Sequence, residues 1–222
     1  MGADNRTEIF VNLKRFDVPK QMGGICPDDS PARWIRSVMD ETVRKGLGGR
    51  EDLHVTYLLP ESLLIPALET LADGGAESTR GISIGSQGVY REDVRPGGNF
   101  GAFTTNLPAA AAKAMGISWS IIGHSEERKD KLSLLAAYDP AAEKPGDAQK
   151  RARSSVDDLV NAEALRAFEA GIDVLFCVGE TEEERGSGSF EEQKPRITEA
   201  LKGQLSRGLA GMAEHLEERQ LV

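Results

Sequence analysis

The chain has 222 residues, which fits one large α/β domain or two small ones. It carries 36 acidic against 27 basic side chains, a formal net charge of −9. Because the Lys and Arg residues are scattered, no broad phosphate-binding surface is expected, and no apolar run is long enough to cross a membrane, so neither nucleic acid nor membrane is an expected partner.

Five short apolar runs, several of them rich in Val or Ile, are typical of strands buried on both faces of a sheet. In chain order the predicted strands are Glu8–Asn12, Leu53–Leu59, Gly81–Ser86, Ser118–Gly123 and Ile172–Val178. Between and after them, apolar residues recur with the period of a helix. The predicted helices are Trp34–Leu47, Glu61–Ala72, Leu107–Met115, Val156–Ala170 and Ile197–Leu216.

Strand alternating with helix predicts parallel strands joined by right-handed crossovers. Five complete βα units are present, and Gln220–Val222 has the character of the start of a sixth strand. The pattern alone fits an open doubly wound sheet as well as a barrel. Two connections, 15–32 and 129–155, are longer than a strand-to-helix turn needs, and we interpret them as enlarged loops that serve either as lids or as solvated decoration.

The cysteine content and the N-terminus bear on the cellular compartment. Cys26 lies beside Pro27 and Cys177 lies inside a predicted strand, which favours reduced thiols in a cytosol. The start, Met1–Arg6, is polar and predicts no signal peptide, so a cytoplasmic location is expected. No Cys and His residues have the spacing of metal ligands, and no metal is expected.

Polar side chains gather where the predicted strands end. They are Asn12 and Lys14, then Gln87, then His124–Glu126, and finally Glu180. In a parallel sheet these ends lie on one face, so the groups can converge. Lys14 suits a phosphate or a negatively charged oxygen, and Asn12 can donate a hydrogen bond. A neutral imidazole at His124 can polarise a carbonyl group, so the pattern predicts an active site.

Four segments carry a resemblance to a known family. They are Val11-Asn12-Leu13-Lys14, Gly101-Ala-Phe-Thr104, Gly123-His124-Ser125-Glu126, and Phe176-Cys-Val-Gly-Glu180 followed by Glu182-Glu-Glu-Arg185. In this order they resemble the motifs after strands 1, 3, 4 and 5 of triosephosphate isomerases, with Leu13 where Trp is usual. The resemblance implies an α/β fold of the TIM (β/α)8-barrel type. Residues 1–222 would form a single incomplete barrel domain with about five of the βα units.

The resemblance also implies roles for the strand-end residues and an isomerase that needs no cofactor. His124 would move protons between the two substrate oxygens, Lys14 would stabilise negative charge, and Asn12 would bind substrate. Glu126 would be the carboxylate near Lys14, either in direct proton transfer or in an ion pair with Lys14 or Arg128. Three further residues would support the site without touching substrate: Ser125, Cys177 and Glu180.

In the family the loop that holds Thr104 enters the site of a second subunit, which implies a homodimer. Here Thr105-Asn106 replaces the usual Gly-Glu, and Glu127 stands where Arg is usual. Both members of a familiar charge pair between subunits are therefore missing, so either the dimer uses different contacts or the association differs.

The implied reaction interconverts glyceraldehyde 3-phosphate and dihydroxyacetone phosphate through an enediolate. The family's carboxylate base stands in a Glu-Pro-x-Trp segment after strand 6, and nothing in this sequence matches it. The chain as printed is therefore predicted to be an inactive fragment. The alternatives are an isomerase of a longer sugar phosphate, such as a tetrulose phosphate, and a non-catalytic phosphate-binding or scaffold protein.

Overall fold

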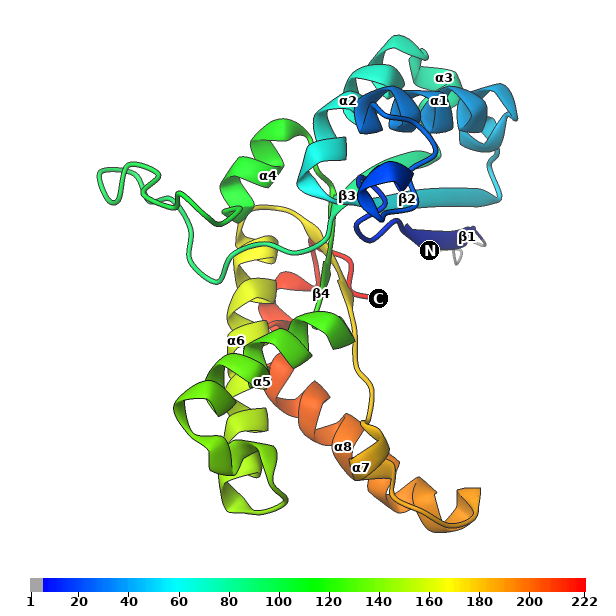
Figure 1. Ribbon diagram of the computed structural model, residues 1–222. Coiled ribbons are helices and arrows are strands. Elements are labelled where there is room, and N and C mark those ends of the chain that lie inside the picture. Colours follow the sequence, from blue (N-terminus) through cyan, green and yellow to red (C-terminus); the bar gives the residue numbers. More distant parts are fainter. Residues whose placement is uncertain (1–5) are drawn as a thin grey trace. The chain divides into compact units, whose positions relative to one another are not determined.

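The computed structural model describes residues 6–222, which form two compact units (Figure 1). The first holds the described residues up to Gly88 together with Ala110–Ser120, and the second holds Val89–Ala109 and Ile121–Val222. Most of the Met1–Arg6 segment, on which the absence of a signal peptide was predicted, lies outside the described residues. Within residues 6–222 no helix is both long and apolar enough to cross a membrane.

The first unit is a parallel sheet covered by helices. Its strands are β1 (Thr7–Asn12), β2 (Leu53–Leu59) and β3 (Ile82–Ser86), and its helices are α1 (Pro31–Arg44), α2 (Glu61–Asp73), α3 (Ala76–Thr79) and most of α4 (Ala109–Met115). Helices α1 and α2 pack together over the sheet (Figure 1). Helix α1 begins where it does because Ser30 accepts a hydrogen bond from the backbone of Arg33 and Pro31 fixes the first helical residue.

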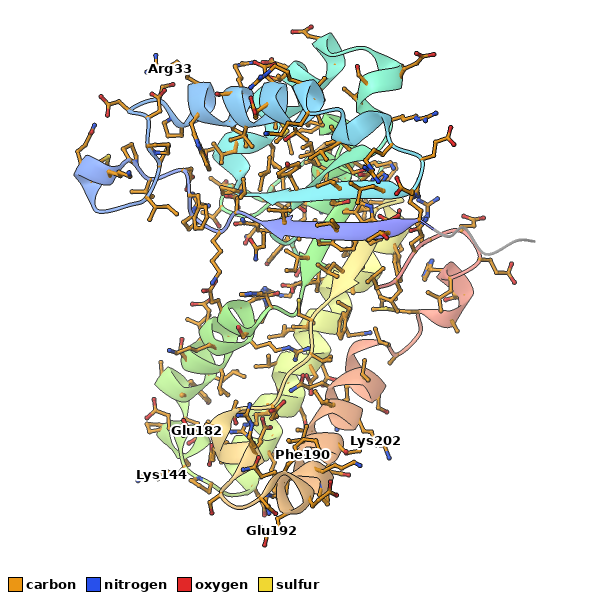
Figure 2. All side chains as sticks on the ribbon, turned by 90° about the vertical axis from the view of Figure 1, so that its right-hand side faces the viewer. Arg33, Lys144, Glu182, Phe190, Glu192 and Lys202 are labelled. Atoms are coloured by element: carbon orange, nitrogen blue, oxygen red, sulfur yellow. The ribbon has the colours of Figure 1, made fainter. Side chains whose placement is uncertain are left out.

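The second unit contains the end of β4 (Trp119–Ile122) and β5 (Asp173–Phe176). Its helices are α5 (Ser125–Tyr138), α6 (Asp147–Glu169), α7 (Glu182–Arg185) and α8 (Phe190–Gly208). Figure 2 labels Lys144 in the connection from α5 to α6, Glu182 at the start of α7 and Phe190 at the start of α8. Leu221 forms a parallel bridge with Val174 of β5, so the predicted beginning of a sixth strand is confirmed.

The strands follow one another in the sheet in the order β1-β2-β3-β4-β5. Strand β4 takes part in both units, since Trp119 pairs with Gly85 of β3 and the Ile122 carbonyl accepts a hydrogen bond from the Cys177 backbone, 2.8 Å away. A doubly wound sheet reverses its strand order in the middle, whereas a barrel adds each new strand on the same side. The observed order is therefore that of a barrel, and the predicted fold class is confirmed.

Two helical regions differ from the prediction. Residues 129–155 are mostly helical, because Leu132, Leu135 and Ala136 of α5 pack with Ala142 and Ala152 into a small apolar cluster. The helix predicted at Ile197–Leu216 runs instead over Phe190–Gly208, followed by a 3₁₀ turn at Ala213–His215.

Candidate active site

The ends of β1, β2 and β3 are tied together by one side chain. The Gln87 amide nitrogen donates to Asn12 Oδ1 at 3.1 Å, to the Lys14 carbonyl at 2.9 Å and to the Leu58 carbonyl at 3.2 Å. Asn12 Oδ1 also accepts from the Lys14 backbone N–H at 2.9 Å. The oxygen of the Asn12 amide is thus engaged within the protein, which leaves its nitrogen available to donate to a bound molecule.

Lys14 has an unusual backbone conformation, with a φ of 42°. For a residue other than glycine, this left-handed backbone conformation costs on the order of 1 kcal/mol or more and persists only where the surrounding structure restrains it. Here the contacts from Asn12 and Gln87 to the Lys14 backbone supply that restraint. Strain of this kind gathers at functional sites, in line with the role that the sequence suggests for Lys14.

In the second unit, His124 lies between the end of β4 and the first turn of α5. It is the N-cap of α5, and its Nδ1 accepts a hydrogen bond from the Glu126 backbone N–H at 3.3 Å. In the neutral ring the proton must then be on Nε2, the nitrogen that can donate to a substrate oxygen. The His124 side chain is 27% exposed and the Glu126 side chain 67%, so both can reach a ligand from solvent.

The backbone beneath His124 is held by Arg128. Its Nε donates to the Gly123 carbonyl at 2.7 Å, one terminal nitrogen donates to the Cys177 carbonyl at 3.2 Å, and the other lies 2.5 Å from Asp157. Arg128 therefore connects the ends of β4 and β5 to α6. Lys14 and Arg128 were the two suggested ion-pair partners of Glu126, and Arg128 is paired with Asp157 instead.

The three residues expected to support the site are Ser125, at the start of α5, and Cys177 and Glu180, in the segment that follows β5. Ser125 is the first residue of α5 and is exposed. Burial and the nearby Glu127 raise the pKa of the Cys177 thiol, which favours a protonated, unreactive cysteine. Glu180 pairs with Arg185 at 2.7 Å, and a backbone hydrogen bond together with Arg185 lowers the pKa of its carboxyl.

One buried ionic cluster was missed from the sequence. Lys131 Nζ lies 2.6 Å from Glu127 Oε1 and 2.9 Å from Glu163 Oε1. The four-residue spacing of Glu127 and Lys131 is a recognisable signal for an ion pair on a helix. Glu163 enters from α6, far along the chain, and no local pattern connects it to the other two.

A cavity of about 930 Å³ lies between α5, α6, α8 and the segment that follows β5. Its lining includes Gly123 and Ser125 next to His124, and Leu132 and Arg153 from the helices that form the enlarged connection. Among residues 6–222 no three or more His, Cys, Asp or Glu side chains are grouped so that they could hold a metal ion.

Thr104 is exposed in the long connection between β3 and α4. That connection is closed by a hydrogen bond from the Tyr90 backbone to the Leu107 carbonyl at 2.8 Å and by edge-to-face packing of Tyr90 on Phe103. Asn12, Lys14 and Gln87 belong to the first unit and His124, Glu126, Cys177 and Glu180 to the second. Hydrogen bonds join the first set, whereas in the second set Glu180 pairs with Arg185.

A parallel sheet whose strands follow in chain order, with polar groups at their C-terminal ends, defines a protein of the (β/α)-barrel class. A sequence profile described as triosephosphate isomerase matches residues 51–219, which is more than half of the chain. The chain belongs to the triosephosphate isomerase family.

The chain is also similar to individual proteins, by sequence in one case and by fold in another. The triosephosphate isomerase of Nitratidesulfovibrio vulgaris is 32% identical over 146 residues, which cover 66% of this chain and 44% of that protein. The crystal structure of triosephosphate isomerase from Bartonella henselae superposes with a TM-score of 0.59 at 23% identity, covering 97% of this chain and 66% of the other. The match to the curated relative thus spans less than half of that protein's length.

Proposed function

We propose that the full-length protein is an aldose–ketose isomerase that interconverts glyceraldehyde 3-phosphate and dihydroxyacetone phosphate through an enediolate, without a cofactor. The observation that carries the proposal is His124 at the end of β4 in a member of this family, with Nδ1 bonded to the Glu126 backbone. This geometry leaves Nε2–H as a donor to the substrate carbonyl oxygen, where negative charge develops in the enediolate.

The other strand-end residues supply complementary groups. Lys14 provides a positive charge for the phosphate or the enediolate oxygen, and the free nitrogen of the Asn12 amide donates to substrate. Glu126, which is largely exposed, either takes part in proton transfer or pairs with a cation. The reaction also needs a base to take the proton from carbon while the electron pair moves toward the carbonyl oxygen.

We assign that base to none of the 222 residues, because the family's Glu-Pro-x-Trp segment is not among them. Loss of a general base alone costs about 10²–10⁴-fold in rate. We therefore propose that a polypeptide of these 222 residues alone does not isomerise triose phosphates at a measurable rate. Assay of that polypeptide beside the full-length protein tests this, and equal rates would refute it.

We further propose a cytoplasmic homodimer in which the Thr104 loop contributes to the contact. Both cysteines are free, which fits a reducing compartment. Glu127 is bound inside its own subunit, so the charge pair that the family uses between subunits is replaced by other contacts. Sedimentation of the full-length protein tests the dimer, and a monomer at micromolar concentration would exclude it.

A second candidate is isomerisation of a longer sugar phosphate, such as a tetrulose phosphate. The observation that favours it is the cavity of about 930 Å³ beside Gly123 and Ser125, which is lined in part by the enlarged α5–α6 connection. Extra room beside the strand 4 end would accept an additional carbon.

The test compares the full-length protein on triose and tetrose phosphates, with His124→Gln as the inactivating variant and the exposed Asp130→Ala of the same helix as control. We expect turnover of the triose pair, a loss of about 10²–10⁴-fold in kcat for His124→Gln, and no change for Asp130→Ala. Turnover of tetrose phosphate alone supports the second candidate. Binding of a triose phosphate without turnover supports the non-catalytic alternative and refutes the proposal.

A further inference from the structure

The turn that precedes His124 is held by side-chain hydrogen bonds to both the N–H and the carbonyl of Gly123. The Gly123 N–H donates to Glu127 Oε2 at 2.7 Å, and its carbonyl accepts from Arg128 Nε at 2.7 Å. Gly123 has a φ of 79° and is closely surrounded, because a Cβ there would lie 2.8 Å from the Cys177 carbonyl oxygen and 3.1 Å from Val160 Cγ1. The residue before His124 is therefore fixed by side-chain hydrogen bonds as well as by packing.

The carboxylate of Glu127 is itself held in place. Its Oε1 accepts from Lys131 at 2.6 Å, and Lys131 also contacts Glu163 from α6. The Glu127, Lys131 and Glu163 side chains are only 21%, 15% and 7% exposed, so the contacts are largely shielded from water. Cys177 also faces this group from the segment after β5.

The ionisation of the cluster keeps Glu127 charged. Burial and the neighbouring Glu127 carboxylate raise the pKa of Glu163 to about 9, so Glu163 is protonated near neutral pH. Burial by itself disfavours the charge on Glu127, but the hydrogen bond with Glu163 and the positive charge of Lys131 hold its pKa below the usual value. The cluster then carries one negative and one positive charge, which lets a buried carboxylate remain an acceptor for the Gly123 N–H.

We propose that Glu127 is a positioning residue for catalysis: its carboxylate fixes the Gly123 turn and thereby the place of the His124 imidazole at the end of β4. This inference rests on the proposed function. It assigns a role inside the subunit to a position where the family usually has Arg, a side chain that has no acceptor and could not make this bond. Glu127 Oε2 supplies a fixed acceptor for the Gly123 N–H, and a fixed turn holds the imidazole in the geometry that the reaction needs.

The experiment compares three variants of the full-length protein with wild type in kcat, KM and hydrogen exchange at the Gly123 amide. Glu127→Ala removes the acceptor, Glu127→Gln keeps an oxygen at the same place, and Asp130→Ala removes an exposed carboxylate from the same helix. We expect Glu127→Ala to lower kcat by about 10- to 100-fold with KM changed less than about twofold, and to speed exchange at Gly123. Glu127→Gln should recover most of kcat and of the protection, and Asp130→Ala should match wild type.

The outcomes separate the inference from the proposed function. If wild type does not turn over triose or tetrose phosphate, the proposed function fails and the catalytic role of Glu127 fails with it. If wild type is active and Glu127→Ala keeps kcat within twofold, only the inference is overturned. Equal losses in the Gln and Ala variants would also overturn it, because the charge and not the hydrogen bond would then matter. Should the Ala variant not fold, Glu127→Met fills the same space without a carbonyl oxygen, and the same results decide.

Discussion

Replacing Glu163 with Gln should change how the stability of the protein depends on pH. Gln is a neutral mimic of the protonated carboxyl, so the variant keeps the contacts of the low-pH form at every pH. In wild type the folded protein binds the Glu163 proton more tightly than the unfolded chain, since the pKa rises from 4.5 to about 9 on folding. The free energy of unfolding of wild type should therefore fall as pH rises between these two values, and level off above about 9.

The size of the effect follows from the same shift. Between the two pKa values the folded protein binds one more proton than the unfolded chain, which changes the free energy of unfolding by at most about 1.4 kcal/mol per pH unit. The free energy of unfolding of Glu163→Gln minus that of wild type should thus be larger at pH 8 than at pH 6 by on the order of 1–3 kcal/mol. The lower end applies if part of the proton uptake is spread over Glu127 and Lys131. Urea unfolding of both proteins at pH 6, 7 and 8 measures it. If the difference in free energy of unfolding between the two proteins does not change with pH, Glu163 is not protonated in the folded protein.

Three further substitutions test other parts of the structure. Gly85→Ala should destabilise the protein by about 1–3 kcal/mol in urea unfolding, because the new Cβ would lie 2.8 Å from the Trp119 carbonyl oxygen, and wild-type stability would contradict the packing. Arg128→Met should cost about 3–5 kcal/mol by leaving Asp157 buried without its partner, and the double variant Arg128→Met/Asp157→Leu should recover part of that loss in the same measurement. Gln87→Leu should cost about 1–3 kcal/mol and lower kcat/KM of the full-length protein, since three acceptors at the strand ends lose their common donor; unchanged kinetics would show that the tie does not serve the site.

Most of the fold could be predicted because its signals are local. Strand β2 was predicted to the residue, since its apolar run lies between Asp52 and Pro60, and the other four were predicted to within two residues at each end. The position of α8 was predicted wrongly although the sequence held the information. Ser189 and Glu192 form a capping box that starts the helix, and Gly211, with a φ of 77°, lies just past its end.

In the candidate site, too, some features follow from local sequence signals and others depend on residues far apart in the chain. Strand-end residues such as Asn12 and His124 could be proposed from the sequence because a parallel sheet places the C-terminal ends of its strands on one face, and their roles stay predictions. The hydrogen bonds that tie the Asn12 amide to Gln87, and the contact of Glu163 with Lys131, depend on pairs far apart in the chain. Such pairs become visible only when the helices and strands are packed, so the sequence could suggest the chemistry of the site but not the network that holds it.

The acidic residue at position 127, where Arg is usual, depends on charged side chains of α5 and α6. A buried carboxylate without a cation would be costly, and removal of one member of such a pair destabilises proteins by several kcal/mol. The cation is Lys131, which lies one turn further along α5 than Glu127. Helix α6 supplies Glu163, which contacts the same Lys131 Nζ. Side chains of α5 and α6 therefore provide the environment in which residue 127 can be acidic and can bind the Gly123 turn.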